Sequence, residues 1–383
     1  MFPKQLKNLF IDFINSEKMG GFLLIACTVI SLVLTNSSIG HQYAGFWEHE
    51  FNGHTITDWI NDGLMAIFFL LIGLELEREI YAGELSDIRK AALPAIGALG
   101  GVLVPAGIYL AFNIGLPSQK GAGIPMATDI AFAIGMLALL GKRVPLSLKI
   151  FLTALAVIDD LCAILVIAFI YSKGIAWMHL GISMGIFVFL LLMNRMKIQL
   201  LSLYLIGGVA MWYFMWHSGI HPTIAGVLLA FALPFRTHKG VNISESLQHF
   251  LHKPVAYFII PVFALANTCI FIDDNWAAIF QSQTGIGIIT GLALGKPLGI
   301  LLFCGIAVFL GICQLPIQLQ WKHLLGAGLL AGIGFTMSIF ITMLAFDDTK
   351  SIQLAKLSIM AASLIASLMG LLTLWMMLKK KEK

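Results

Sequence analysis

The sequence predicts an all-α membrane protein with twelve transmembrane helices, and three observations support this fold class. Only 11% of the 383 residues are charged, against about 25% in an average soluble domain. The mean hydropathy is +0.91 over the whole length, which leaves too few polar residues to cover a water-facing surface. Apolar runs of about 20 residues recur along the chain, the length that crosses about 30 Å of hydrocarbon. Soluble globular, disordered and fibrous proteins are thereby excluded.

The apolar segments follow one another with short connections, so residues 1–383 are predicted to form a single transmembrane domain. Residues 1–18 form an amphipathic cytoplasmic stretch, and the apolar run behind it lacks a small-residue cleavage pattern, which indicates an uncleaved first span. The five cysteines lie in or beside apolar runs without metal-ligand spacing and are interpreted as packing residues. The twelve expected spans cover residues 19–35, 59–81, 93–113, 121–140, 147–171, 177–193, 199–216, 220–235, 254–272, 284–310, 324–346 and 352–378.

The positions of the basic residues predict the orientation of the chain. With a cytoplasmic N-terminus, nearly all Lys and Arg residues between the spans fall on the cytoplasmic side, including the basic tail 379–383, and only Lys120, Lys173 and Lys350 fall outside. Cytoplasmic loops of membrane proteins carry such an excess, so both termini are predicted to be cytoplasmic. The net charge of +4 does not indicate a nucleic-acid partner. In a membrane protein the placement of Lys and Arg on the cytoplasmic side is informative, and their sum is not.

The first external loop, residues 36–58, is predicted to contain a small β-hairpin. Its Asn52-Gly53 pair stands between two short segments, and Asn-Gly is the strongest short-range signal for a type I′ hairpin turn. An irregular polar loop is the alternative interpretation.

Two segments are interrupted by residues that a continuous helix tolerates poorly. The fourth contains Gly121, Gly123 and Pro125 ahead of Thr128 and Asp129, and the eleventh contains four glycines between residues 326 and 334. The two segments run in opposite directions, so spans three to five and ten to twelve are predicted to be inverted-topology repeats with crossed, interrupted helices. Such breaks mark the substrate site of many transporters; a close-packing surface of small residues is the alternative.

Four charged residues fall halfway along predicted spans: Asp129 in the fourth, Asp159 and Asp160 in the fifth, and Lys296 in the tenth. Each costs at least about 2.5 to 3.5 kcal/mol at the centre of a membrane helix, so all four are expected to face a bundle interior or a water-filled cavity. Because neighbouring helix residues point about 100° apart, one aspartate of the pair can face Lys296 and the other the cavity with Asp129. We expect Asp159 to be the partner of Lys296. A purely structural Lys296, which only neutralises one aspartate, is the alternative.

These groups suit a site that binds either protons or a small cation. Carboxylates, the Thr128 hydroxyl and carbonyls freed by the helix break are hard oxygen ligands for an alkali cation. Burial raises carboxylate pKa values and a nearby ammonium lowers them, so protons can compete for the same oxygens. A site that holds one or the other, and opens to each side in turn, would exchange the two.

A second charged group is predicted at the cytoplasmic end of the second span. Glu75, Arg78 and Glu79 share one helix face by their spacing. A solvated helix end and a funnel that senses pH both fit this composition, because histidine titrates at about pH 6.5. His221 is open to the same two interpretations, and Asp62 is predicted to face an interface. The group also contains Glu77, Glu84 and, in the loop before the ninth span, His249, His252 and Lys253.

Five motifs in this order resemble the NhaA family of bacterial sodium/proton antiporters, and the resemblance covers essentially the whole chain. They are Gly73-Leu74-Glu75 with Arg78-Glu79, the run Ala127-Thr128-Asp129-Ile130-Ala131-Phe132-Ala133, the run Ala156-Val157-Ile158-Asp159-Asp160-Leu161, the run Gly295-Lys296-Pro297-Leu298-Gly299, and the run Gly332-Ile333-Gly334-Phe335-Thr336-Met337-Ser338.

The resemblance implies a transporter rather than an enzyme, without a cofactor: an electrogenic exchanger of the bacterial inner membrane that expels Na⁺ or Li⁺ against entering protons at alkaline pH and so supports salt tolerance. It implies that Asp159 and Asp160 bind the transported Na⁺ and protons, that Thr128 and Asp129 lie on the crossed segments, and that Lys296 faces the site. It also implies a homodimer through the external β-hairpin. The residues it assigns to the pH response are Glu75, Arg78, Glu79, His221, His249 and His252. Gln248 stands where the family pattern has an acidic residue, which leaves the pH set-point open.

Other functions of intramembrane aspartates fit less well. An intramembrane aspartyl protease needs a Gly-x-Gly-Asp motif that is absent from the sequence, and a cation channel would gain nothing from an internal lysine or inverted broken helices. A proton- or sodium-coupled symporter of a small organic solute stays open, because folds with crossed half-helices carry several substrates.

Overall fold

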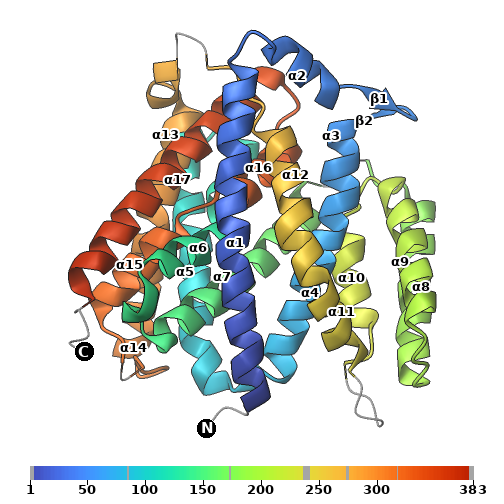
Figure 1. Ribbon diagram of the computed structural model, residues 1–383, viewed down its shortest axis with the longest axis horizontal. Coiled ribbons are helices and arrows are strands. Elements are labelled where there is room, and N and C mark those ends of the chain that lie inside the picture. The colour runs from blue at the N-terminus through green and yellow to red at the C-terminus, as the bar shows by residue number, and fades with distance from the viewer. Residues whose placement is uncertain are drawn as a thin grey trace.

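The computed structural model describes residues 4–83, 86–171, 174–235, 242–272, 276–316 and 318–378, which fold into a bundle of long helices (Figure 1). A single two-stranded antiparallel sheet accompanies the helices within these ranges. The elements are α1 (Lys4–Thr35), α2 (Gly40–Trp47), β1 (Glu50–Phe51), β2 (His54–Thr55), α3 (Ile56–Asp58), η1 (Trp59–Leu64), α4 (Met65–Tyr81), α5 (Ile88–Asn113), η3 (Pro117–Met126), α6 (Ile130–Leu139), η4 (Gly141–Arg143), α7 (Leu146–Ile170), α8 (Trp177–Arg195), α9 (Leu201–Trp216), α10 (Ile224–Ala232), α11 (Ile243–Pro254), η5 (Val255–Ile259), α12 (Ile260–Asn267), η6 (Trp276–Phe280), α13 (Gln283–Thr290), η7 (Gly291–Gly295), α14 (Lys296–Phe309), α15 (Trp321–Ala331), α16 (Phe335–Ala345) and α17 (Thr349–Met377).

Seven helices in the described part of the chain are long and apolar enough to cross a membrane. The number rises to ten if each of three bent helix pairs counts as one span. The chain is therefore a multi-span membrane protein. Each of the twelve expected segments contains a helix, but α9 has 16 residues and α10 has nine, fewer than the roughly 20 of a full crossing.

Both interrupted segments form broken helices. The 3₁₀ helix η3 and helix α6 meet at 44° around residues 127–129, and α15 and α16 meet at 48° around residues 332–334. Pro125 lies in the last turn of η3, where its missing N–H disfavours a continuous helix. A Cβ atom on Gly332 would lie 2.4 Å from the carbonyl oxygen of Leu292, so glycine is required for the second break to pack against the π-helical turn η7.

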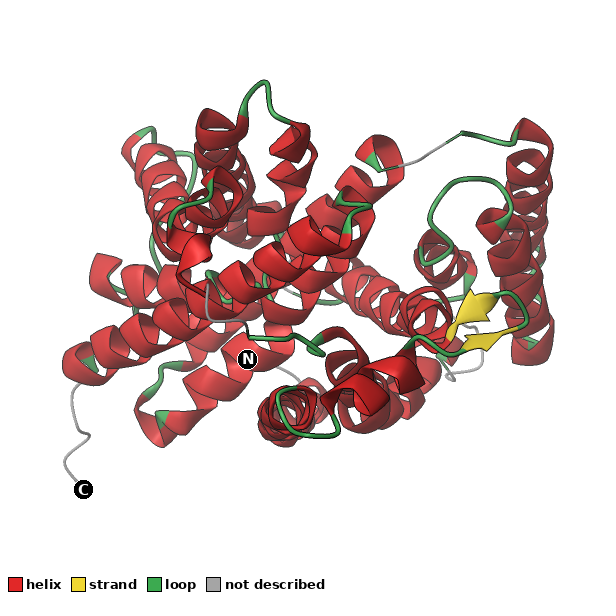
Figure 2. Ribbon diagram, turned by 90° about the horizontal axis from the view of Figure 1, so that it is seen from above, coloured by secondary structure: helices red, strands yellow, loops and turns green. Residues whose placement is uncertain are grey.

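Packing around the breaks brings together segments that are distant in the sequence. Helix α1 crosses the front of the bundle in Figure 1 and packs against α6 and α12, and α5 packs against α14. A Cβ atom on Gly100 of α5 would lie 2.2 Å from the carbonyl oxygen of Gly299 of α14, so these helices approach backbone to backbone. Helices α8 and α9 form a pair at one side of the bundle in both views (Figures 1 and 2). This close α5–α14 contact holds the start of α14, where Lys296 lies, against the centre of the bundle.

The loop at residues 36–58 is more regular than predicted. Glu50 pairs with Thr55 and Phe51 with His54, and the turn residues Asn52 and Gly53 have φ angles of 56° and 81°, as a type I′ turn requires. Helix α2 precedes the strands and was not expected; its axis is bent by 120° from that of α1. The α2–β1–β2 segment lies at the end of the bundle opposite the start of α1 (Figure 1).

The segment before the ninth predicted span is a helix, so the prediction of a loop there is wrong. Helix α11 begins after Asn242, whose side chain accepts a hydrogen bond from the Glu245 N–H at 3.3 Å, and it continues through the π turn η5 into α12. Pro254, where the ninth span was predicted to begin, is instead the last residue of α11. His249 and His252 therefore lie on a helix that packs against α4. Glu84 and the basic tail 379–383 lie outside the described residues.

Candidate ion-binding site at the crossing of the broken helices

The two broken helices are in direct main-chain contact at their breaks. The N–H of Asp129 donates to the carbonyl of Ile333 at 2.7 Å, which links the extended residues 127–129 to residues 332–334. The middle of α7, with Asp159 and Asp160, and the first residue of α14, Lys296, are the other segments that supply charged side chains to this region. The structure thus brings together the four charges that the sequence places within spans.

Asp129 is held by hydrogen bonds from two helix N-termini. Its carboxylate accepts from the N–H of Phe132 at 2.9 Å as the N-cap of α6. It also accepts from the N–H of Thr336 at 3.1 Å, in the first turn of α16, and from the Thr336 hydroxyl. Helix N-termini favour a negative charge through their free N–H groups and dipole, so Asp129 joins the two half-helices electrostatically as well as sterically.

Asp159 forms the ion pair of the site. Its Oδ2 lies 3.0 Å from Nζ of Lys296, and both side chains are fully buried. The Thr128 hydroxyl lies 2.7 Å from the same oxygen and 2.9 Å from the carbonyl of Ala331, so one proton serves two acceptors. Lys296 also donates to the carbonyl of Met126 at the end of η3. The predicted contact between Lys296 and Asp159 is thus present in the structure.

Asp160 is less well compensated. It is only 1% exposed, yet among the described residues its Oδ1 atom has no hydrogen-bond partner, and neither has Oδ1 of the neighbouring Asp159. The great majority of buried polar atoms in proteins are hydrogen-bonded, and a buried carboxylate oxygen without a partner is costly. A proton or a cation would satisfy both oxygens.

The oxygens available for a cation are two carboxylates, a threonine hydroxyl and backbone carbonyls. In the part of the chain that the structure describes, no group of three or more His, Cys, Asp and Glu side chains is placed to hold a metal ion. The donors are all hard oxygens, which suit alkali and alkaline-earth cations rather than transition metals.

The second charged group is divided into separate contacts. Glu75 is 4% exposed and its Oε1 lies 3.8 Å from Nδ1 of His252. Arg78 pairs with its neighbour Glu79 at 2.8 Å. The burial of Glu75 argues against a simple solvated helix end.

Two of the residues assigned to the pH response lie apart from Glu75. His249 is on the exposed side of α11. His221 precedes α10, and its Nε2 lies 3.3 Å from Oδ1 of Asp62. Asp62 is thus the partner of His221, a contact that the prediction of an interface position did not include.

Several residues of these contacts were not selected from the sequence. Thr336 binds Asp129, Ser244 of α11 donates to Glu77 at 2.8 Å, and the side chains of Asn61 and Asn267 bind each other at 2.8 Å. Thr336 follows the glycines of the eleventh segment as Asp129 follows those of the fourth, and this parallel could have drawn attention to it. Ser244 and the Asn pair carry no such signal.

The fold and the site define a class of protein: a multi-span helical transporter with buried charges at a crossing of broken helices. Residues 11–374 match the Na⁺/H⁺ antiporter 1 family, and the chain belongs to this family. It is 59% identical to the Na⁺/H⁺ antiporter NhaA of Cytophaga hutchinsonii, covering 98% of this chain and 97% of the relative. It is 58% identical to the NhaA antiporter of Flavobacterium psychrophilum over 98% of both chains. The NhaA antiporter of Vibrio cholerae is 45% identical over 98% of this chain and its own full length.

Proposed function

We propose that this protein exchanges Na⁺ or Li⁺ for protons across the membrane, with Asp159 and Asp160 as the site at which the ions compete. The observation that carries the proposal is the pair of buried Oδ1 atoms without hydrogen-bond partners on these neighbouring aspartates. In the loaded state a cation binds the two carboxylates, with the Thr128 hydroxyl within reach. In the unloaded state protons take its place. Neither form leaves a bare carboxylate pair in a low-dielectric interior.

Charge compensation by Lys296 makes the exchange electrogenic in this mechanism. Two carboxylates face one monovalent cation, so more than one proton can leave for each cation that binds. When a cation neutralises Asp159, the ion pair with Lys296 at 3.0 Å loses part of its attraction, and the ammonium proton can leave as well. The net movement of positive charge then runs opposite to the cation.

Alternating access rests on the crossed helices. The main-chain bond from Asp129 to Ile333 and the hydrogen bonds of Asp129 to both half-helices support a crossing that moves as one unit with its ion site. We further propose that spans three to five and ten to twelve are inverted repeats in a bundle of twelve crossings. Both triplets contain a broken helix, with bends of 44° and 48°.

The proposed orientation has both termini in the cytoplasm and the β-hairpin outside, in the inner membrane of a bacterium. The excess of basic residues on one side supports it. The start of α1 and the end of α17 lie toward the same side of the bundle, opposite α2 and the hairpin (Figure 1). Phe51 on the hairpin is 69% exposed, which suits its proposed role as a dimer contact.

The pH response is assigned to the contacts of Glu75, Arg78, Glu79 and His252, with His249 and His221 as further members. Glu75 is buried on α4, and α4 packs against α7, the helix that carries Asp160. Protonation of His252 at 3.8 Å from Glu75 can therefore change the charge that Asp160 experiences without blocking the site.

Reconstituted liposomes test the function directly. With an acid interior and no organic solute present, addition of Na⁺ or Li⁺ outside should dissipate the pH gradient, and K⁺ should not. An imposed membrane potential should change the rate if the exchange is electrogenic. Cation-independent proton movement, or a strict need for an organic solute, would contradict antiport and favour the symporter alternative.

A further inference from the structure

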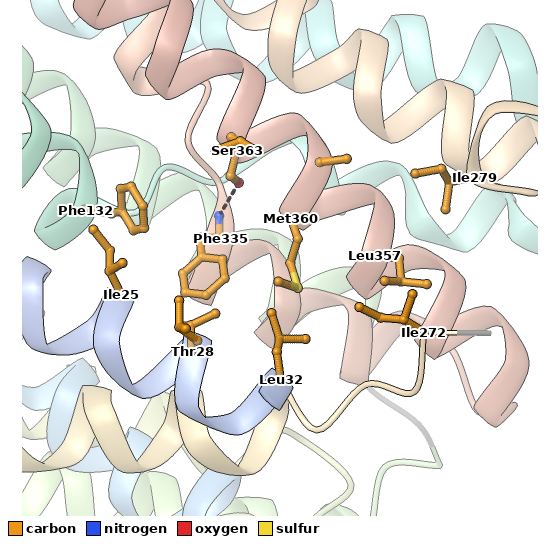
Figure 3. Close-up of a pocket in the computed structure, with 13 residues that line it drawn as sticks. Ile25, Thr28, Leu32, Phe132, Ile272, Ile279, Phe335, Leu357, Met360 and Ser363 are labelled. Carbon is orange, nitrogen blue, oxygen red and sulfur yellow. Dashed lines mark hydrogen bonds between the residues drawn. The ribbon is translucent and has the colours of Figure 1, made fainter. Parts of the chain in front are cut away.

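A groove lies on the flank of the bundle between α1 and α17, with a volume of about 390 Å³ (Figure 3). Its walls are the second half of the apolar part of α1, from Ile25 to Leu32, and α17 from Leu357 to Leu364. Both helices belong to spans that are apolar enough to cross a membrane. The volume falls within the range of about 300 to 1,000 Å³ that is typical of ligand sites.

One end of the groove is closed by Phe132 of α6 and Phe335 of α16 (Figure 3). Their rings meet edge to face, with centroids 5.6 Å apart. The same two residues reach the ion site through their backbones. The N–H of Phe132 donates to Asp129, and Phe335 directly precedes Thr336, which donates to the other oxygen of Asp129. The groove and the crossing of the broken helices thus share one aromatic wall.

The polar atoms of the groove are already engaged. The Thr28 hydroxyl donates to the carbonyl of Leu24 at 2.8 Å, and the Ser363 hydroxyl accepts from the N–H of Phe335 at 3.2 Å (Figure 3). The other lining side chains are apolar. A polar ligand would lose its hydration without replacement, whereas a hydrocarbon chain loses nothing.

The groove also has the position and length of an acyl chain in one leaflet. It extends from Ile272 and Ile279, in the segment between α12 and α13, to the aromatic pair at the helix breaks (Figure 3). The eight residues from Ile25 to Leu32 span about 10 Å of helix, against about 15 Å for half of the hydrocarbon core. Val29 and Leu364 on its rims are 52% and 61% exposed, so hydrocarbon borders the opening.

We propose that the groove between α1 and α17 binds one acyl chain of a membrane phospholipid, and that this chain supports the crossing of the broken helices by packing against Phe132 and Phe335. The binding of the acyl chain is independent of the transported ions. Its support of the broken helices, the second half of the proposal, rests on the proposed antiport activity.

Photo-crosslinking tests the binding. The full chain is reconstituted with phosphatidylcholine that carries a diazirine near the end of one acyl chain, and labelled peptides are located by mass spectrometry. We expect labelling at Met360 and Leu364 to exceed labelling at Leu372 and Trp375 several-fold. The latter two lie on the same helix outside the groove and are 57% and 59% exposed. Equal labelling at the two places would overturn the proposal.

Filling the groove tests its effect on exchange. Ala361→Phe places a ring among the groove residues, and Leu372→Phe is the matched control at an exposed position outside it. Ala361→Leu serves if the larger variant does not fold. The groove variant should lose the label and exchange several-fold more slowly at an unchanged apparent cation affinity, while the control should match the wild type. If the groove variant lost the label but exchanged ions at the wild-type rate, the proposed support of the broken helices by the acyl chain would be overturned. Wild-type protein that labels in the groove but exchanges no cation would instead contradict the proposed antiport.

Discussion

The two charged regions of this protein hold their charges in different ways. At the crossing, Asp129, Asp159 and Lys296 are 0 to 2% exposed and are held by threonine hydroxyls, helix N-termini and carbonyls of the broken segments. At the contact of α4 with α11, Glu75 meets His252, with side chains 6% and 14% exposed, and the neighbouring Arg78–Glu79 pair on α4 is 15% and 13% exposed. Irregular backbone compensates charge in the first region, and neighbouring side chains compensate it in the second.

This difference suggests two separate tasks. A charge fixed by backbone and short side chains cannot move away when its partner changes, so every change of occupancy at the crossing must be balanced within the site. Long, partly exposed side chains can be rehydrated at small cost. The crossing therefore suits obligatory ion binding, and the α4–α11 contact suits adjustment of its field.

The strongest test of the comparison is Asp160→Asn. It removes a carboxylate that lacks hydrogen-bond compensation, so cation-dependent proton movement in liposomes should fall to the background of empty vesicles while the variant keeps its thermal transition. The matched variant Glu75→Gln, at a carboxylate that is 4% exposed, should keep exchange with an altered pH profile. Exchange by Asp160→Asn at the wild-type rate would contradict the assignment.

The next test is the ion pair of Asp159 with Lys296. Lys296→Met leaves a buried carboxylate without its partner, which costs about 3 to 5 kcal/mol in comparable cases, and the melting temperature in detergent should fall by several degrees. The double variant Asp159→Asn with Lys296→Met removes both charges and should recover much of this loss. If the double variant lost as much stability as the single variants Asp159→Asn and Lys296→Met together, the two residues would not be coupled.

A smaller effect is expected at Thr336. Thr336→Val removes the hydroxyl donor to Asp129 but keeps the backbone N–H. Loss of one hydrogen bond to a charged group costs about 1.5 to 3 kcal/mol, so both the melting temperature and the exchange rate should decrease. Thr336→Ser retains the hydroxyl and should behave as the wild type; a serine variant as impaired as the valine variant would assign the effect to packing.

At the α4–α11 contact we expect a shift without loss. His252→Gln removes a titratable group 3.8 Å from Glu75. At this partly solvated position the interaction between the two charges is about 1 kcal/mol or less. The activity profile should therefore shift by about one pH unit or less. His249→Gln, on the exposed side of the same helix, should shift the profile less. The apparent cation affinity at each optimum should be unchanged in both, and a large affinity loss would place His252 in the ion path.

The smallest effect is expected at Asp348, an exposed counterpart of Asp129. It caps α17 by accepting from the N–H of Ser351 at 2.8 Å, and this bond holds the pKa of Asp348 below its usual range. Its charge therefore stabilises the fold above the unfolded-state pKa of about 3.9, and the contribution is lost as the pH falls through the folded-state pKa. Asp348→Asn should lower the melting temperature slightly at neutral pH and not at all well below pH 4. A large drop in melting temperature at neutral pH would show that the exposed cap Asp348 matters as much for stability as the buried cap Asp129.

Composition and the placement of charges were enough to predict a helical membrane protein and the residues that meet at the crossing. The broken segments follow from Pro125 and the glycines, which are local signals. The predicted pairing of Lys296 with Asp159 is confirmed, but the spacing of the two aspartates alone does not decide between them. The choice depends on the relative rotation of α7 and α14, and that rotation is set by tertiary packing. The helix α11 was missed although its sequence carries local helix signals: Leu247 and Leu251 are four residues apart and both buried, and Asn242 caps its start. The partner of His221 is distant in sequence and carries no pattern that identifies it.

The π-helical turn η7, Gly291–Gly295, ends directly before Lys296. A π turn holds one residue more than an α turn, because each N–H bonds the fifth rather than the fourth preceding carbonyl. Deleting a single residue within it would leave a regular α-helix that still packs and still spans the bilayer. Because the wide turn takes up the extra residue, the helical segments before and after it would keep their orientations, and the lysine would still face Asp159. The same deletion within the α-helical residues of α13 would instead turn every residue on one side of it by about 100° relative to the other side. The π turn is therefore the place in this span where the chain can lose one residue without redirecting Lys296.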